Sequence, residues 1–243
     1  MTLFDQEIAP CRCEWGAIGY DALAPADVVI IVDVLSFSTC IDIAVSRGAA
    51  ILPYAWKDSS AIVFAQQHKA ELAVARGTNG YSLSPASFLN APAGLRCVLP
   101  SPNGAAVTLR AAMKSTVILA GCLRNASAIA NLAKQLGKTF NVCPAGERWP
   151  DGSLRPAIED WLGAGAILRH LPGTKSPEAA AAVAAFEEAR PTIAERIAYS
   201  SSGRELIDRG FGQDVDLAVA LDVSVQAPRF DGSAFISNQQ TDA

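Results

Sequence analysis

The segment Asp27–Leu35, DVVIIVDVL, constrains the fold of this chain more than any other. It is short, nearly all apolar and rich in Val and Ile, which is typical of a β-strand buried on both faces. Such strands occur in mostly parallel sheets with helices on each side, because that arrangement hides both faces from water. We therefore expect this segment to lie inside a layered α/β protein.

Strand and helix patterns alternate along the chain after this segment. Predicted strands cover residues 27–35, 49–54, 72–77, 96–100, 116–121 and 139–146, and predicted helices cover 38–48, 59–70, 104–114 and 125–137. This alternation favours right-handed crossovers and a mostly parallel sheet in a three-layer α/β/α fold. From about residue 157 the pattern turns helical, over 157–171 and 176–189, before a candidate last strand at 223–230 and a loose tail after Phe230. We predict one domain over residues 1–243.

Composition and charge narrow the class of protein. Half of the residues are hydrophobic and 18% are charged, which excludes a disordered chain. The net charge of −4 argues against a nucleic-acid partner, and no apolar run approaches the roughly 18 residues of a membrane-spanning helix. The first residues lack the pattern of a secretion signal, and the six cysteines form no CxxC pair. We therefore expect a cytoplasmic protein with reduced thiols.

Five segments are candidates for a ligand site, because ligands of open α/β sheets bind beyond the carboxyl ends of the strands. They are Asp33–Thr39, Arg76–Gly80, Pro100–Gly104, Gly121–Asn125 and Cys143–Arg148. Three of them lead directly into predicted helices, whose first backbone N–H groups form an anion site. Such anion sites lead us to expect a phosphorylated or carboxylated small molecule as the ligand. The dinucleotide motif GxGxxG and the P-loop motif GxxxxGK[ST] are absent from the sequence, so those two kinds of site lack support.

Three acidic side chains are candidates for catalysis or metal binding. Asp33 stands inside an apolar strand, where a carboxylate must be paired, hydrated or bound to a metal ion. Alternatively, it caps a neighbouring loop by accepting hydrogen bonds from backbone N–H groups. Glu159 and Asp160 fall in the first turn of a predicted helix, where they either supply oxygen ligands for Mg²⁺ or only complement the helix dipole.

Amide and guanidinium side chains at the strand ends likewise allow either a functional or a purely structural interpretation. The Asn103-Gly104 pair either lets the backbone approach a ligand closely or forms a plain tight turn. Asn125 is either a site residue or a helix N-cap. Arg76 suits the binding of a phosphate or sulfonate through its rigid fork, or else it forms a surface ion pair. The same alternatives apply to Glu147 and Arg148.

Several motifs resemble, in order, those of one enzyme family. VVIIVDVLSFST is similar to a signature in which an apolar strand ends in Asp-Val-Leu-Arg-Ala-Ser-Thr, and Pro102-Asn103-Gly104 matches part of a Thr-Thr-Asn-Gly-Thr turn. Five later segments of this chain also resemble motifs of the family: GCLRNASAIA, VCPAG, Glu159-Asp160, Gly163-Ala164-Gly165 and the stretch from Ser201 to Asp222. The family is that of the 2-phosphosulfolactate phosphatases of the ComB type, and the resemblance covers roughly residues 27–228.

The resemblance implies a Mg²⁺-dependent acid phosphatase with the three-layer α/β/α fold of the ComB type. It would hydrolyse 2-phosphosulfolactate to 3-sulfolactate and phosphate, a step of coenzyme M biosynthesis. Asp33 and Asp160 would hold the metal ion, with Glu159 as the alternative to Asp160. The predicted catalytic residues are Asp33, Asn103, Asn125 and Glu159, and the predicted substrate-binding residues are Ser36, Ser38, Thr39, Arg76, Gly104 and Arg148.

Two other functions stay open at this point. Ser36 and Ser101-Pro102 stand where the family motif has Arg and Thr-Thr, which supports a divergent member that binds a small anion without catalysis or with another specificity. An unrelated transferase would use the same strand-end anion site. We predict a small phosphorylated acid as the partner, no nucleic acid and no membrane, and we leave a homodimer open.

Overall fold

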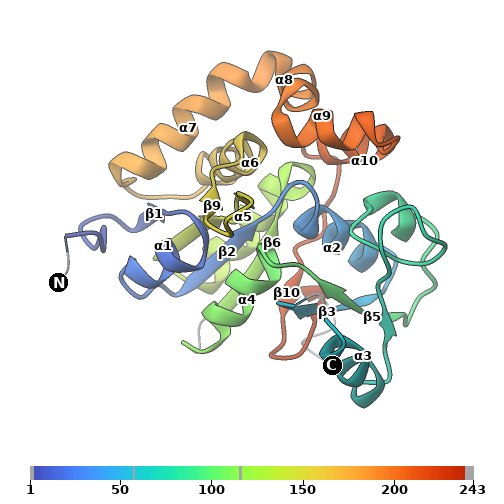
Figure 1. Cartoon of the computed structure of the whole chain (residues 1–243). Coiled ribbons are helices and arrows are strands. Elements are labelled where there is room, and N and C mark those ends of the chain that lie inside the picture. The colour runs from blue at the N-terminus through green and yellow to red at the C-terminus, as the bar shows by residue number, and fades with distance from the viewer. Residues whose placement is uncertain (1–2, 57, 115–116, 239–243) are drawn as a thin grey trace.

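A large sheet forms the middle of the computed structural model, which describes residues 3–56, 58–114 and 117–238 (Figure 1). Within these residues the sheet has nine strands. In spatial order they are β1 (Cys11–Cys13), β7 (Phe140–Pro144), β2 (Val28–Val32), β6 (Val117–Gly121), β10 (Arg229–Phe230), β11 (Phe235–Ile236), β3 (Ala50–Tyr54), β5 (Arg96–Pro100) and β4 (Glu71–Leu72).

Two parallel blocks make up this sheet. Strands β1, β7, β2 and β6 pair in parallel, and so do β3, β5 and β4. The short hairpin of β10 and β11 lies between the blocks and pairs antiparallel with β6 on one side and with β3 on the other. The prediction of a mostly parallel sheet is confirmed. The predicted last strand 223–230 is reduced to β10 at its end, and its partner β11 is an addition that the sequence pattern did not indicate.

The expectation of a loose tail after Phe230 is wrong for the residues up to Asn238. Strand β11 lies in this tail, and Phe235 is fully buried with its ring edge-on to that of Phe37, at 6.2 Å between centroids. A buried aromatic side chain stabilises the hairpin through the apolar area that it removes from water. The rest of the tail, residues 239–243, lies outside the described residues.

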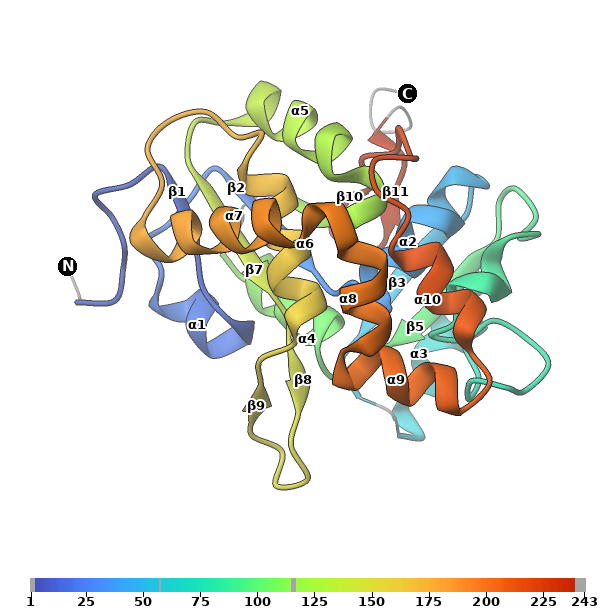
Figure 2. The ribbon, with the colours of Figure 1, turned by 90° about the horizontal axis from the view of Figure 1, so that it is seen from above.

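Helices cover both faces of the sheet, as the two views of Figures 1 and 2 show. They are α1 (Gly16–Ala22), α2 (Phe37–Ser46), α3 (Ser60–Gln67), α4 (Gly104–Ala112), α5 (Ala126–Leu136), α6 (Ile158–Leu168), α7 (Pro177–Ala189), α8 (Ile193–Tyr199), α9 (Ser201–Asp208) and α10 (Gly212–Ala218). Helices α2 and α4 share one hydrophobic core with the sheet, and α5, α6 and α7 share another. The three-layer α/β/α prediction is therefore confirmed.

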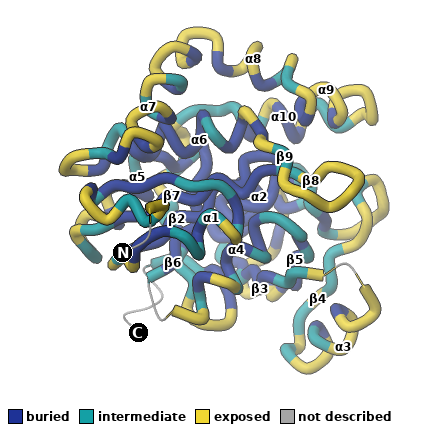
Figure 3. The backbone as a smooth tube through the Cα atoms, turned by 60° about the vertical axis from the view of Figure 1, so that its left-hand side comes forward, coloured by how far each residue is buried: buried dark blue, intermediate teal, exposed yellow. Residues whose placement is uncertain are grey.

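Strand β2 shows why its sequence must be apolar throughout. Val28, Ile30 and Val32 belong to the core beneath α5, α6 and α7, whereas Val29 and Ile31 pack on the side of α2 and α4. Successive side chains of a strand point to opposite faces, so a strand between two helical layers needs an apolar residue at every position. Figure 3 shows this buried interior in dark blue, beneath helices whose outer faces are exposed.

Several element boundaries differ from the sequence prediction. The predicted strand 72–77 is reduced to β4 at Glu71–Leu72, and strand β1 and helix α1 were not predicted. Thr116, the first residue of a predicted strand, lies outside the described residues. All six cysteines are free and buried, which confirms the expected reduced thiols. Among the described helices, none combines the length and the apolar character that crossing a bilayer requires.

Candidate active site

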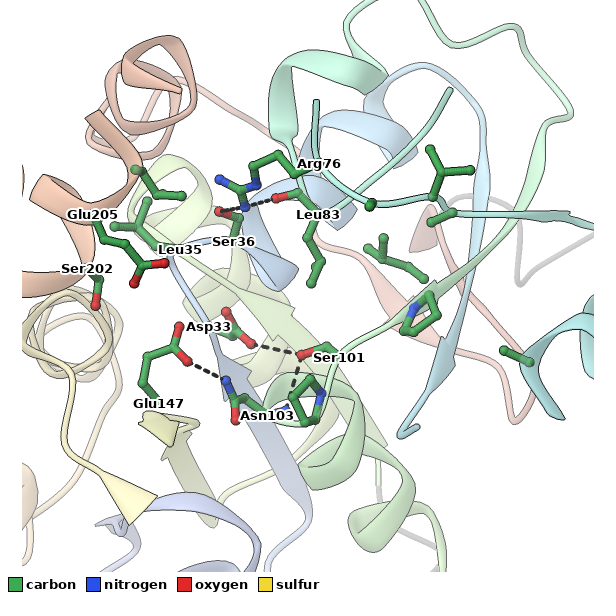
Figure 4. Close-up of a pocket in the computed structure, with 18 of the residues that line it drawn as sticks. Asp33, Leu35, Ser36, Arg76, Leu83, Ser101, Asn103, Glu147, Ser202 and Glu205 are labelled. Atoms are coloured by element: carbon green, nitrogen blue, oxygen red, sulfur yellow. Dashed lines mark hydrogen bonds between the residues drawn. The ribbon is translucent and has the colours of Figure 1, made fainter. Parts of the chain in front are cut away.

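A cavity of about 550 Å³ opens where the loops after β2 and β5 meet helix α9 and a second, small hairpin of β8 (Glu147–Arg148) and β9 (Leu154–Arg155). The polar and charged side chains that line it are Asp33, Ser36, Asp58, Arg76, Ser101, Asn103, Glu147, Ser202, Glu205 and Arg209. Figure 4 shows most of them gathered on one side of the cavity. Because they come from segments far apart in the sequence, this site is a product of the tertiary fold.

Asp33 follows β2 and is held by the first backbone amides of two helices. Its Oδ1 accepts a hydrogen bond from the N–H of Phe37, at the start of α2, at 3.0 Å. Its Oδ2 accepts one from the N–H of Gly104, at the start of α4, at 2.9 Å, and lies 3.5 Å from the Ser101 hydroxyl. A carboxylate is stabilised at helix N-termini by their N–H groups and dipoles. Asp33 is thus both a cap and part of the cavity wall.

Gly104 makes the contact with Asp33 sterically feasible. A Cβ atom at this position would lie 2.4 Å from Cδ1 of Phe37 and 2.8 Å from Oδ2 of Asp33. Both distances are too short for real atoms, so only glycine lets the helix start approach the carboxylate. The close backbone approach expected at Asn103-Gly104 therefore exists, and its partner within the described structure is the carboxylate of Asp33.

Asp160 joins the loops that follow β2 and β7. Its Oδ1 accepts a hydrogen bond from the N–H of Val34 at 2.7 Å, and its Oδ2 accepts one from the N–H of Gly146 at 2.8 Å. Burial raises the pKa of Asp160, and the charges of Asp33 and Glu159 raise it further. Asp160 thus bonds to the residue that follows Asp33, but it is not one of the described residues that line the cavity.

Glu147 reaches the cavity from the β8–β9 hairpin. Its Oε2 accepts a hydrogen bond from Nδ2 of Asn103 at 2.9 Å. Arg148, the next residue, ties the hairpin to the loop after β5, since its Nη2 donates to the carbonyl of Pro102 at 3.0 Å. Burial, together with the charge of Asp33, raises the pKa of Glu147 to about 7. A carboxyl group that titrates near neutral pH is suited to giving or accepting a proton.

Arg76 presents a guanidinium to the cavity and is fixed from behind by Asp214. Its Nη1 lies 3.1 Å from Oδ2 of Asp214, and both side chains are largely buried. The hydroxyl of Ser84 donates to the other oxygen of Asp214 at 2.6 Å. Nη2 of Arg76 donates to Oγ of Ser36 at 3.1 Å and to the carbonyl of Leu83. This is a buried ion pair at the cavity rather than the surface pair considered from sequence.

Glu159 belongs to a buried cluster with Ser202 and Arg155. Burial raises the pKa of Glu159, while a hydrogen bond with Ser202 and the charge of Arg155 oppose that shift. Among the described residues, its Oε2 has no hydrogen-bond partner. Arg155 donates from Nη2 to Oγ of Ser202 at 2.9 Å, and Ser202 in turn lines the cavity. An unpartnered buried carboxylate oxygen is costly, which makes Glu159 a candidate for a functional group.

Seven predicted site residues are not among the described residues that line the cavity, namely Ser38, Thr39, Gly104, Asn125, Arg148, Glu159 and Asp160. Of these, Ser38, Thr39 and Asn125 are fully buried. The hydroxyls of Ser38 and Thr39 donate to backbone carbonyls close to Asp33, at 3.1 and 2.7 Å. The amide of Asn125 bonds to the backbone of its own turn. These side chains hold the loops that carry the site in place.

Helix α9 and the residue that follows it contribute side chains that sequence reasoning missed, namely Ser202, Glu205 and Arg209. Arg209 donates from Nη1 to Oε1 of Glu205 at 2.9 Å. The spacing of these residues places them on one helix face, but a polar helix face is also what any solvent-exposed helix shows. No signal in the sequence could therefore distinguish this face as part of a cavity.

A metal ion at this site would find few protein ligands. Within the described residues, no group of three or more His, Cys, Asp or Glu side chains could hold a metal ion. Mg²⁺ is often bound by only one or two carboxylates together with substrate phosphate oxygens and water. Asp33 places its carboxylate at the wall of the cavity. The donor set thus fits a Mg²⁺ ion shared between Asp33 and a phosphate.

Comparison with known proteins yields consistent matches. The family model described as 2-phosphosulpholactate phosphatase matches residues 20–232. The 2-phosphosulfolactate phosphatase of Methanothermobacter thermautotrophicus is 29% identical over 205 residues, which cover 82% of this chain and 84% of that protein. The probable 2-phosphosulfolactate phosphatase of Carboxydothermus hydrogenoformans is 31% identical over 205 residues, covering 80% and 82%. That of Gloeobacter violaceus is 28% identical over 213 residues, covering 84% and 88%.

Proposed function

This chain belongs to the 2-phosphosulfolactate phosphatase family, and we propose that it is a phosphoric monoester hydrolase that converts 2-phosphosulfolactate to 3-sulfolactate and phosphate. One observation carries the proposal. The family match over residues 20–232 spans all the described segments that line the cavity, which supports a related activity at this site.

Asp33 is the residue on which we centre the mechanism. It stands at the cavity wall with its carboxylate fixed by two helix N-termini, so it needs no rearrangement when a ligand enters. We include Mg²⁺ in the proposal with Asp33 as its protein ligand. When bound there, the ion would neutralise part of the charge on the phosphate.

Ser36 and Arg76 are the groups that we assign to binding the acidic oxygens of the substrate. Arg76 uses three N–H groups within the protein and has two more, while the hydroxyl of Ser36 accepts from Arg76 and can donate onward. The ion pair with Asp214 fixes the guanidinium, so less conformational freedom is lost when an anion binds.

Glu147 is the group that we assign to proton transfer. Hydrolysis breaks the bond between phosphorus and the C2 oxygen of the substrate and forms a bond between phosphorus and a water oxygen. The departing alkoxide takes a proton from Glu147, and the attacking water returns one, so the carboxyl group ends as it began. Asn103 positions this carboxyl through the hydrogen bond to Oε2.

The test is phosphate release from 2-phosphosulfolactate, measured with Mg²⁺ and again with EDTA. We expect turnover with Mg²⁺, a loss of at least about a hundredfold in the variant Glu147→Gln, and unchanged turnover in Glu188→Gln. Glu188 is an exposed residue of α7 whose carboxylate pairs with Arg196, so it controls for the loss of an acid elsewhere. Substrate binding without turnover would instead support the non-catalytic alternative, and equal turnover in EDTA would remove Mg²⁺ from the mechanism.

A further inference from the structure

The cavity extends well beyond its polar side into an apolar arm. The arm is formed by Ala61, Leu72, Val74, Leu99 and Pro100. It runs along the edge of the sheet at β4 and β5, where α3 packs over both strands. Figure 4 shows the labelled polar groups on one side of the cavity and side chains made only of carbon on the other. The arm is thus continuous with the space in which we place the phosphate.

The volume of the cavity exceeds what a three-carbon acid needs. At about 550 Å³ it falls in the range of roughly 300–1,000 Å³ that is typical of pockets enclosing drug-sized ligands. A phosphorylated lactate derivative held by Asp33, Ser36 and Arg76 occupies only the polar side. The arm is therefore available to a further group on the same molecule.

The charges around the cavity indicate what kind of substituent the apolar arm can accept. The ionisable side chains that line it are Asp33, Asp58, Glu147, Glu205, Arg76 and Arg209. Both guanidiniums are already paired with carboxylates, and among the described residues the ionisable side chain next to the arm is that of Asp58, whose carbonyl accepts from the N–H of Ala61. A second anionic group in the arm would lose its hydration without meeting a free cation from the part of the chain that the structure describes, which is costly. A hydrocarbon group would instead gain from leaving water.

We propose that the apolar arm binds a hydrocarbon side chain of the substrate, so that the enzyme acts on phosphorylated 2-hydroxy acids with an aromatic side chain as well as on 2-phosphosulfolactate. This inference rests on the proposed function, because it places the phosphate beside Asp33. The acid whose side chain is a benzyl group, 2-phospho-3-phenyllactate, fits both halves of the cavity. Its methyl counterpart, 2-phospholactate, leaves the arm empty.

The experiment compares kcat/KM for these two esters and for 2-phosphosulfolactate on the wild-type protein. We expect the phenyl compound to exceed 2-phospholactate by about tenfold or more, because each methylene buried in an apolar pocket gives roughly a tenfold or larger gain. A smaller ratio overturns the inference while leaving the proposed function intact. Release of phosphate from none of the three compounds overturns the proposed function itself.

A pair of variants localises the effect. Val74→Asp puts a charge into the arm at a side chain that is already 40% exposed, so the fold should tolerate it. We expect the ratio of phenyl to methyl kcat/KM to fall by about tenfold in this variant. Val63→Asp, at a 53% exposed position of α3 outside the cavity wall, serves as control and should keep the wild-type ratio. A Val74→Asp protein with the wild-type ratio would overturn the assignment of the arm.

Discussion

Replacing Asp33 by asparagine tests whether its carboxylate holds the two helix N-termini as well as serving the cavity. In the native protein each oxygen accepts one backbone N–H, from Phe37 at 3.0 Å and from Gly104 at 2.9 Å. An amide offers one oxygen, so one of these N–H groups would face an NH₂ group and lose its partner. A hydrogen bond to a charged group contributes about 1.5–3 kcal/mol to the free energy of unfolding. Because asparagine no longer buries a charge, the saved cost of desolvation offsets part of that loss. We expect a net destabilisation of about 2 kcal/mol.

The measurement is urea denaturation of both proteins in EDTA, so that no metal ion contributes to the difference. A thermal melt in the same buffer should show a Tm lower by about 4–8 °C, at roughly 2–4 °C per kcal/mol for a chain of this size. Asp231→Asn is the matched control, because Asp231 accepts two backbone N–H bonds on one oxygen in an exposed turn, and an amide keeps both. Its stability should change by less than about 0.5 kcal/mol. An Asp33→Asn protein as stable as the wild type would refute the assignment of Asp33 as a cap.

Two further predictions concern neighbours of Asp33. In EDTA, wild-type protein should lose about 2 kcal/mol of stability relative to Glu147→Gln between pH 5 and pH 8, because the folded-state pKa of Glu147 is raised from 4.5 to about 7. Protonated Glu147 stabilises the wild-type protein fully below pH 4.5, and this stabilisation is lost as pH rises through 7. Parallel plots of the free energy of unfolding against pH for the two proteins would contradict this. Gly104→Ala should destabilise by about 2 kcal/mol or more, since its Cβ would overlap Phe37 and Asp33. Gly212→Ala, whose Cβ would meet its nearest neighbour at 4.0 Å, should be neutral in the same denaturation assay.

The layers of the fold could be predicted because local patterns encode them. An uninterrupted Val and Ile run specifies a strand with two buried faces, and β2 has that environment. The central β10–β11 hairpin could be predicted only in part, since β10 is the end of the predicted strand 223–230 and β11 was not predicted. Each of its strands has two residues, and the hairpin depends on the burial of Phe235 against residues distant in sequence. Two residues are too few to show any periodicity.

The walls of the cavity escaped prediction for a related reason. Asp33 and Asn103 follow regular strands, so the carboxyl-end rule finds them. The rule also finds the segment of Glu147, but the place of this side chain at the cavity depends on the contact of Arg148 with the loop after β5. Ser202 follows no strand, and its place depends on contacts such as that with Arg155. Contacts of this kind are specified by the folded structure as a whole and leave no local pattern.

Ser36 shows how a single position can mislead when it is considered alone. Serine stands there in place of the arginine of the family motif, which suggests that the site has lost a cation for binding an anion. In the folded protein, Arg76 arrives from another loop and donates a hydrogen bond to Oγ of Ser36 at 3.1 Å. Asp214 holds this guanidinium at the cavity wall. A positive group is therefore present beside position 36, supplied by a residue 40 positions further along the chain. Judging whether the site can bind an anion thus requires Ser36, Arg76 and Asp214 to be considered together.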